Sequence, residues 1–154
     1  MNTISMLING EQTQASNGAV FERRNPLDGS VATRAPAATV LDAIAAVEAA
    51  SEAFPAWAAL GPSERRALLL KAAAALEAKT AQFTEAMAAE TGASAMWAGF
   101  NVHLAAGILL EAAALTTQIN GEVIPSDVPG NLALAVRQPA GVVLGMAPWN
   151  APVI

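Results

Sequence analysis

The sequence predicts an α/β protein, because strand-like and helix-like patterns follow one another along its 154 residues. Short β-branched and aromatic segments with tight-turn signals open the chain, and long stretches with apolar residues at helical spacing follow. Two further strand-like segments and an uncharged apolar run come last. About a quarter of the residues are alanine, which favours closely packed helices over a β-sandwich.

The first strands are expected at residues 4–8, 20–23 and 31–34. Asn9-Gly10 is a tight-turn signal directly after the first of them. In Asn25–Gly29 the proline fixes φ and the glycine accepts a positive φ, so the second and third strands should form a hairpin.

Three helical stretches are expected after these strands. The first should begin behind Thr39, which stands three residues before Asp42 in a variant of the capping box, and Pro55 should interrupt or end it. Pro62 suits the first position of the second, in which Thr80 marks a break or a new start.

The third helix should run from about Ser94 to Ile119, after a C-terminal cap at Gly92. Its apolar residues surround the axis almost completely, which predicts burial on most sides. An uncharged run lies between Glu90 and Glu111 and is long enough to span a membrane. Because it contains several polar residues and no basic residue flanks it closely, a soluble cytoplasmic protein is expected instead.

The last third of the chain predicts strands at residues 122–125, 132–137 and 142–147, the last of them buried. A chain that stops at Ile154, soon after a buried strand, looks cut in mid-fold, so we expect it to be a fragment. The expected division is 1–120 for a hairpin and helical part, 121–138 for exposed strands, and 139–154 for the start of a sheet.

Composition excludes several classes of function. There is no cysteine, so this segment contains no thiolate nucleophile and no disulfide. His103 is the only histidine and cannot form a histidine metal site alone, so no metal is expected. Eight basic residues against thirteen acidic ones give a net charge of −5, which speaks against a nucleic-acid partner.

The loop after the last predicted strand is the best candidate for chemistry. Ligands of open α/β sheets bind beyond the carboxyl ends of the strands, where Met146–Pro152 is expected. Its prolines stiffen the loop, Trp149 should anchor it, and the amide of Asn150 could stabilise an oxyanion. The alternative is that Asn150 caps a following helix; the two roles could coexist.

Motifs in this order resemble the aldehyde dehydrogenase superfamily over essentially the whole chain. The matching segments are Leu7–Glu11, Asn25–Gly29, Ala53–Trp57, Ser63–Ala67, Glu90–Gly92, Arg137–Val142 and Pro148–Pro152. The resemblance implies the amino-terminal part of that fold, with the strands of 121–138 in subunit contacts and the first strand of a dinucleotide-binding sheet at the end. A homo-oligomer is therefore expected.

The resemblance also implies a reaction, in which an aldehyde is oxidised to the acid with NAD through a thiohemiacetal on a cysteine; NADP is not excluded. Asn150 matches the residue whose amide steadies the oxyanion of that intermediate. Met146, Ala147, Pro148 and Trp149 match the segment that lines the nicotinamide end of the cofactor site. The nucleophile and the general base are not in this segment, so the segment alone should be inactive.

Residues 90–103 resemble the same helix in dehydrogenases of aromatic aldehydes such as salicylaldehyde. Phe100, Asn101 and Leu104 are near the turn that contributes to the substrate pocket, and Trp97 lies one turn earlier. An apolar wall with an aromatic ring suits a flat aryl aldehyde. The alternative is that Trp97 and Phe100 only fill the core between helices.

His103 is expected to be a packed or hydrogen-bonded helix residue, and Glu90 and Glu111 are expected at helix ends or in solvent. The competing functions are a non-catalytic association domain of the same fold, a dehydrogenase of a non-aromatic aldehyde, and a membrane-binding helical protein.

Overall fold

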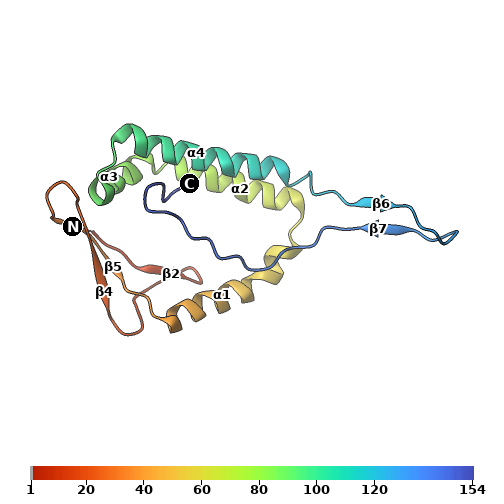
Figure 1. Cartoon of the computed structure of the whole chain (residues 1–154), viewed down its shortest axis with the longest axis horizontal. Coiled ribbons are helices and arrows are strands. Elements are labelled where there is room, and N and C mark those ends of the chain that lie inside the picture. Colours follow the sequence, from red (N-terminus) through yellow and green to blue (C-terminus); the bar gives the residue numbers. More distant parts are fainter. Residues whose placement is uncertain (1) are drawn as a thin grey trace.

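The computed structural model describes residues 2–154 and places small β units, a group of helices and a two-stranded arm in sequence order. Figure 1 shows the arm β6–β7 projecting from one end of the helices. From the arm the chain returns as an extended segment and ends beside them. The α/β class predicted from the sequence is confirmed.

Two β units form the start of the chain. Strands β2 (Met6–Ile8) and β3 (Glu11–Thr13) form an antiparallel hairpin. Its turn has positive φ at Asn9 and Gly10, +52° and +77°, as the Asn-Gly signal predicts. Strands β4 (Val20–Arg24) and β5 (Val31–Pro36) form the predicted hairpin. Strand β1 (Asn2–Thr3) pairs with β5 in parallel and was not predicted.

Helix α1 (Val40–Ala59) begins with the predicted capping box. The Thr39 hydroxyl accepts the Asp42 N–H, and the Asp42 carboxylate accepts the Thr39 N–H. Asp42 also accepts the backbone N–H of Ser16, which ties the loop before β4 to the helix start. The prediction that Pro55 interrupts or ends the helix is wrong. Because Pro55 stands near the end, it removes one hydrogen bond there and the last turn still closes.

Helices α2 (Pro62–Glu77), α3 (Thr80–Thr91) and α4 (Ala95–Leu115) pack together, with α4 against both of the others. Pro62, Thr80 and Gly92 have the predicted positions at helix ends, and Gly92 has the left-handed φ of +69°. The predicted third helix is confirmed as α4, four residues shorter at its carboxyl end.

The expectation that α4 is buried on most sides is wrong within the described chain. Buried residues lie on the side that faces α2 and α3, with Ala98, Ala106 and Val102 at 1% exposure or less. Large apolar residues on the other side are exposed, including Ile108 at 51%. An apolar pattern on every side of a helix indicates which sides the helix can bury. Among residues 2–154, α2 and α3 cover α4, and they do so on one side.

Strands β6 (Glu122–Ile124) and β7 (Ala133–Ala135) form the predicted pair as an antiparallel ladder. The arm contacts no other part of the described chain closely, and Val123 and Leu134 are 73% and 55% exposed. These exposed strands carry apolar residues that a further surface could cover.

The predicted buried strand at residues 142–147 is not formed. Residues 139–148 have no regular secondary structure, and Val143, Leu144 and Met146 are 78%, 81% and 86% exposed. A strand needs a partner for its backbone groups, and the described residues supply none beside this segment. The apolar composition predicts a strand, but pairing and burial depend on neighbours that sequence proximity does not provide.

Candidate active site

The loop at the end of the chain has a defined turn. The N–H of Ala151 reaches the carbonyl of Pro148 at 3.4 Å, and the N–H of Ile154 reaches that of Ala151 at 3.3 Å. Trp149 is 70% exposed, so it does not anchor the loop by burial as expected. The backbone and side chains of Met146–Trp149, the predicted cofactor-binding segment, are therefore open to a ligand.

Asn150 lies in this turn and is exposed. Among the hydrogen bonds of residues 2–154, none uses its side-chain amide, so both N–H donors are free for a ligand. Only residues 151–154 follow it in this chain, so its alternative role as a helix cap stays a prediction. Its backbone carbonyl accepts a hydrogen bond from the indole N–H of Trp97, at 3.1 Å.

Trp97 and Phe100 lie on the exposed side of α4, near its start. Their rings are stacked, with centroids 5.4 Å apart and planes inclined by 23°. They are 42% and 48% exposed, so within the described residues they do not fill the core between helices. Leu104, which is 38% exposed, follows one turn later. The structure therefore brings an aromatic pair on α4 to the loop that carries Asn150.

Asn101, the third predicted substrate-pocket residue, has a different environment. It is fully buried, and its side-chain N–H donates to the carbonyl of Trp97 at 2.9 Å. Its side-chain oxygen has no partner among the described atoms. The structure thus separates Asn101 from the exposed surface of Phe100, because residues at i and i+1 of a helix point in different directions.

A cavity of about 360 Å³ lies under the loop. It is bounded by Arg23 of β4, by one side of α3 and by the residues around Trp149; the full set is Arg23, Phe83, Ala86, Met87, Glu90, Thr91, Ala147, Pro148, Trp149, Pro152 and Val153. Sequence reasoning missed this cavity, because its walls come from three segments far apart in the chain.

Glu90 lies one residue before the end of α3, as expected, but it is only partly exposed. Its carboxylate accepts a hydrogen bond from the hydroxyl of Thr33, a buried residue of β5, at 2.6 Å. Glu90 thus has the expected position at a helix end, and Glu111 is exposed as expected. A contact between residues that are 57 positions apart leaves no local signal in the sequence.

His103 is neither packed nor hydrogen-bonded through its side chain among residues 2–154, contrary to expectation. Its side chain is 84% exposed and its Nδ1 lies 3.9 Å from a carboxylate oxygen of Glu77 on α2. No group of three potential metal-ligating side chains occurs among residues 2–154.

The carboxylates with lowered pKa lie outside the loop and the aromatic pair. A hydrogen bond from Arg34 lowers the pKa of Glu22, and hydrogen bonds from Ser30 lower that of Asp28. The backbone N–H of Thr39 has the largest lowering effect on the pKa of Asp42. The hydrogen bonds behind these shifts stabilise local structure in the amino-terminal half and lie outside the loop of Asn150.

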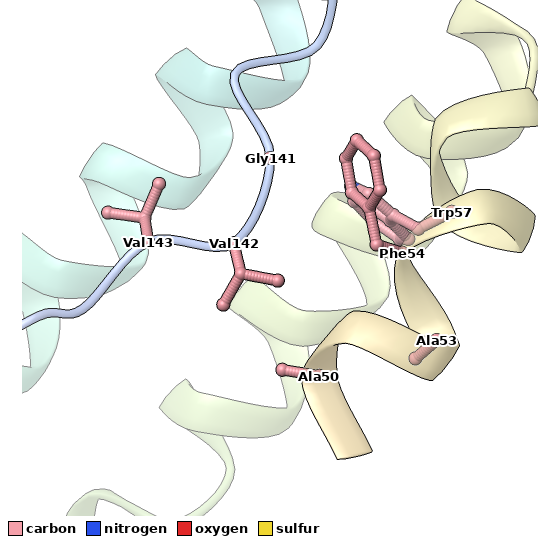
Figure 2. Close-up of a pocket in the computed structure, with 7 residues that line it drawn as sticks. All are labelled: Ala50, Ala53, Phe54, Trp57, Gly141, Val142 and Val143. Carbon is pink, nitrogen blue, oxygen red and sulfur yellow. The ribbon is translucent and has the colours of Figure 1, made fainter. Parts of the chain in front are cut away.

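A second cavity, of about 370 Å³, separates α1 from the extended segment (Figure 2). Phe54 and Trp57 of α1 lie on one side of it, and Val142 and Val143 on the other. Trp57 lies within α1 and is 45% exposed. The extended segment and α1 thus present apolar side chains to one another without close packing.

Residues 13–154 match the aldehyde dehydrogenase family, and the chain belongs to this family. It is 62% identical to a vanillin dehydrogenase of Pseudomonas fluorescens over its whole length, and 50% identical to a salicylaldehyde dehydrogenase of Pseudomonas sp. strain C18 over 149 residues. It spans about a third of the length of these relatives, 32% and 31%.

Solved structures give the same result for the fold. The salicylaldehyde dehydrogenase of Pseudomonas putida G7, complexed with salicylaldehyde, has a TM-score of 0.93 and 49% identity. The match covers 99% of this chain and 32% of that one. A benzaldehyde dehydrogenase of Corynebacterium glutamicum, described as NAD-dependent, has a TM-score of 0.76 and 32% identity over 82% of this chain and 28% of its own. The fold predicted from the resemblance is thus confirmed.

Helix α4 is long and apolar enough to cross a membrane by length and composition alone. A core helix of a soluble protein passes the same test, and the buried side of α4 packs against α2 and α3. This packing accounts for the apolar residues on one side of α4, where 33% of its most apolar window is buried.

Proposed function

We propose that this chain forms part of an NAD(P)-dependent dehydrogenase that oxidises an aromatic aldehyde to the carboxylic acid. One observation carries the proposal: the stacked pair Trp97–Phe100 is hydrogen-bonded to the loop that presents Asn150. A flat apolar surface and an uncommitted amide therefore lie beside one another. The similarity to vanillin and salicylaldehyde dehydrogenases supports the aromatic substrate class.

In this proposal Asn150 is the catalytic residue of the chain. Its two amide N–H groups, which make no hydrogen bond within residues 2–154, would donate to the aldehyde oxygen as negative charge develops there. A donor that is already in position stabilises the oxyanion without reorganisation. The attacking cysteine comes from outside this segment, since the segment contains none.

The exposed face of α4 would hold the aryl ring. Phe100 and Leu104 present apolar surface one turn apart, and the Phe100 ring is already stacked on Trp97. Aromatic rings pair in this offset manner with a favourable free energy of about 0.5–1.5 kcal/mol beyond area burial. Because Asn101 is buried behind this face, we assign it no contact with substrate and a structural role in α4.

The cofactor, when bound, supplies the acceptor for the aldehyde hydride. Exposure of Met146, Trp149 and the backbone between them fits one wall of a nicotinamide site, and the described residues supply no other wall. The choice between NAD and NADP is open among similar proteins. One solved relative is described as NAD-dependent and another, from E. coli and 30% identical, as NADP-dependent. We propose NAD as the first cofactor to test.

We also propose that the arm β6–β7 takes part in a homo-oligomer. Its apolar residues Val123 and Leu134 are exposed, and the arm extends away from the rest of the chain (Figure 1). An exposed ladder edge with apolar side chains is suited to pairing with another chain.

The proposed activity can be tested with a hybrid enzyme in which this chain replaces the matching third of the Pseudomonas fluorescens vanillin dehydrogenase. Reduced cofactor is measured with vanillin, salicylaldehyde and an unbranched alkyl aldehyde. We expect aryl aldehydes to be preferred by about tenfold or more in kcat/KM. The chain alone should form no reduced cofactor, because it has no cysteine.

Two results would contradict the proposal at different levels. A folded hybrid that oxidises no aldehyde would leave only a non-catalytic association role for this chain. A hybrid that prefers the alkyl aldehyde would keep the dehydrogenase activity and remove the aromatic substrate class. The unmodified vanillin dehydrogenase serves as the matched control for assembly and assay conditions.

A further inference from the structure

One hydrogen bond connects the terminal segment to the helices. Among the hydrogen bonds of residues 2–154, the one from the indole N–H of Trp97 to the carbonyl of Asn150 is the only one that joins residues 139–154 to any earlier residue. The two residues are 53 positions apart. The acceptor belongs to the same residue as the proposed oxyanion donor.

Trp97 is itself held in place from three directions. Its backbone N–H donates to the hydroxyl of Ser94, the N-cap of α4, at 3.2 Å. Its carbonyl accepts the side-chain N–H of Asn101, a fully buried residue. Its ring is stacked on Phe100. The donor that reaches the loop therefore belongs to a residue that is held at its N–H, its carbonyl and its ring.

Apart from this hydrogen bond, the prolines already restrict several backbone torsions of the loop. Pro148 and Pro152 have fixed φ, and the residues before them, Ala147 and Ala151, are restricted by the proline rings. Trp149 and Asn150 keep the main backbone freedom of the loop. A hydrogen bond to the carbonyl of Asn150 restrains the peptide plane that follows it, and with it the direction in which the side chain leaves the backbone.

We propose that Trp97 is a positioning residue, which acts through its indole N–H on the backbone of Asn150 and so sets the direction of the oxyanion-stabilising amide. This inference rests on the proposed function for its catalytic consequence. Trp97 also stacks on Phe100, so one residue contacts both the proposed aryl-binding face and the backbone of the amide donor. Trp97 is thereby given a role distinct from substrate contact.

A first test uses the 154-residue chain without any activity assay. Solvent exchange of the indole N–H groups, followed by NMR, should be slowest for Trp97, because Trp57 and Trp149 have no partner for theirs among residues 2–154. Trp97→Phe removes the donor and keeps an aromatic ring. We expect it to raise amide exchange at residues 149–154 by about three- to tenfold, the equivalent of one hydrogen bond. Amides in the middle of α4 should change by less than about twofold.

Trp57→Phe is the matched control, because it removes an indole from α1 and should leave exchange at residues 149–154 unchanged. Unchanged exchange of the loop in Trp97→Phe, or fast exchange of the Trp97 indole, would overturn the inference. General loosening of α4 in Trp97→Phe would do so as well, since it would assign Trp97 to helix stability.

A second test measures turnover in the hybrid enzyme with a double-mutant cycle. Trp97→Phe should lower kcat by about three- to tenfold with little change in KM. In the Asn150→Ala background it should have no further effect on kcat, because its action passes through Asn150. Independent, multiplicative losses would overturn the inference, and so would a change confined to KM. An inactive unsubstituted hybrid would contradict the proposed function alone, because the exchange experiment still decides the role of Trp97.

Discussion

Asp42 joins two parts of the amino-terminal half through hydrogen bonds to its carboxylate. The N–H groups of Thr39 and Ser16 donate to it, and the residue is 8% exposed. The Thr39 N–H is the largest cause that lowers its pKa below the ordinary value of 3.8. A carboxyl group with a lowered folded-state pKa stabilises the fold above its unfolded value, and this contribution is lost as the pH falls through the folded value.

The prediction for Asp42 concerns the pH dependence of stability. Asp42→Asn should be less stable than the unsubstituted chain near neutral pH, and the difference should shrink progressively as the pH falls below about 3.8. Urea unfolding of both proteins, near neutral pH and below about pH 3.8, measures this difference in stability. Asp127→Asn, in the exposed turn between β6 and β7, is the control. A difference that is the same at both pH values would show that the charge of Asp42 is not involved.

At the scale of the element, α4 has two sides with different predicted roles. Val102 is 1% exposed on the side that packs against α2 and α3, and Phe100 is 48% exposed on the other. Val102→Ala removes two buried carbon groups and should lower the free energy of unfolding by about 1–3 kcal/mol. Phe100→Ala should lower the free energy of unfolding much less. Equal losses in urea unfolding of the two variants would contradict this division of the helix.

The exposed side of α4 should govern substrate preference. In the hybrid enzyme, Phe100→Ala removes a ring from the proposed aryl-binding face. We expect kcat/KM for vanillin and salicylaldehyde to fall by about tenfold relative to an alkyl aldehyde. An unchanged ranking of aldehydes would assign Phe100 to packing against parts of the enzyme outside this chain.

Elements with local determinants were predictable from the sequence. The Asn9-Gly10 turn, the Thr39–Asp42 box and the Gly92 cap depend on residues within four positions of one another, and all three have the expected geometry. The extent of α1 beyond Pro55 was not predicted, because the effect of a proline depends on how much helix remains after it.

Features that depend on distant residues were not predictable. The hydrogen bond from Trp97 to Asn150 joins positions 53 apart, and the one from Thr33 to Glu90 joins positions 57 apart. The sequence indicated Asn150 and Phe100 separately, and their relation through Trp97 required the structure. Likewise, the apolar residues 142–147 predicted a strand, whose formation depends on partner strands that residues 2–154 do not place beside it.

At the scale of the whole molecule, the proposed oligomer gives a prediction for the arm β6–β7. Leu134 is 55% exposed and lies in the middle of β7. In the hybrid enzyme, Leu134→Lys should shift the molar mass measured by light scattering toward the monomer, because a buried charge opposes association. Leu27→Lys, at an 81% exposed position in the turn between β4 and β5, should leave the mass unchanged. An unchanged mass for Leu134→Lys would remove the arm from the subunit contact.

The role of Asn150 is the central claim, and its replacement in the hybrid enzyme tests it most directly. Asn150→Ala removes both amide donors from an exposed residue, so the free energy of unfolding of the chain should hardly change. Turnover of vanillin should fall by about 10²–10³, the usual effect of losing one oxyanion donor. A variant that keeps full turnover would contradict the oxyanion role and, with it, the assignment of this loop as the catalytic part of the chain.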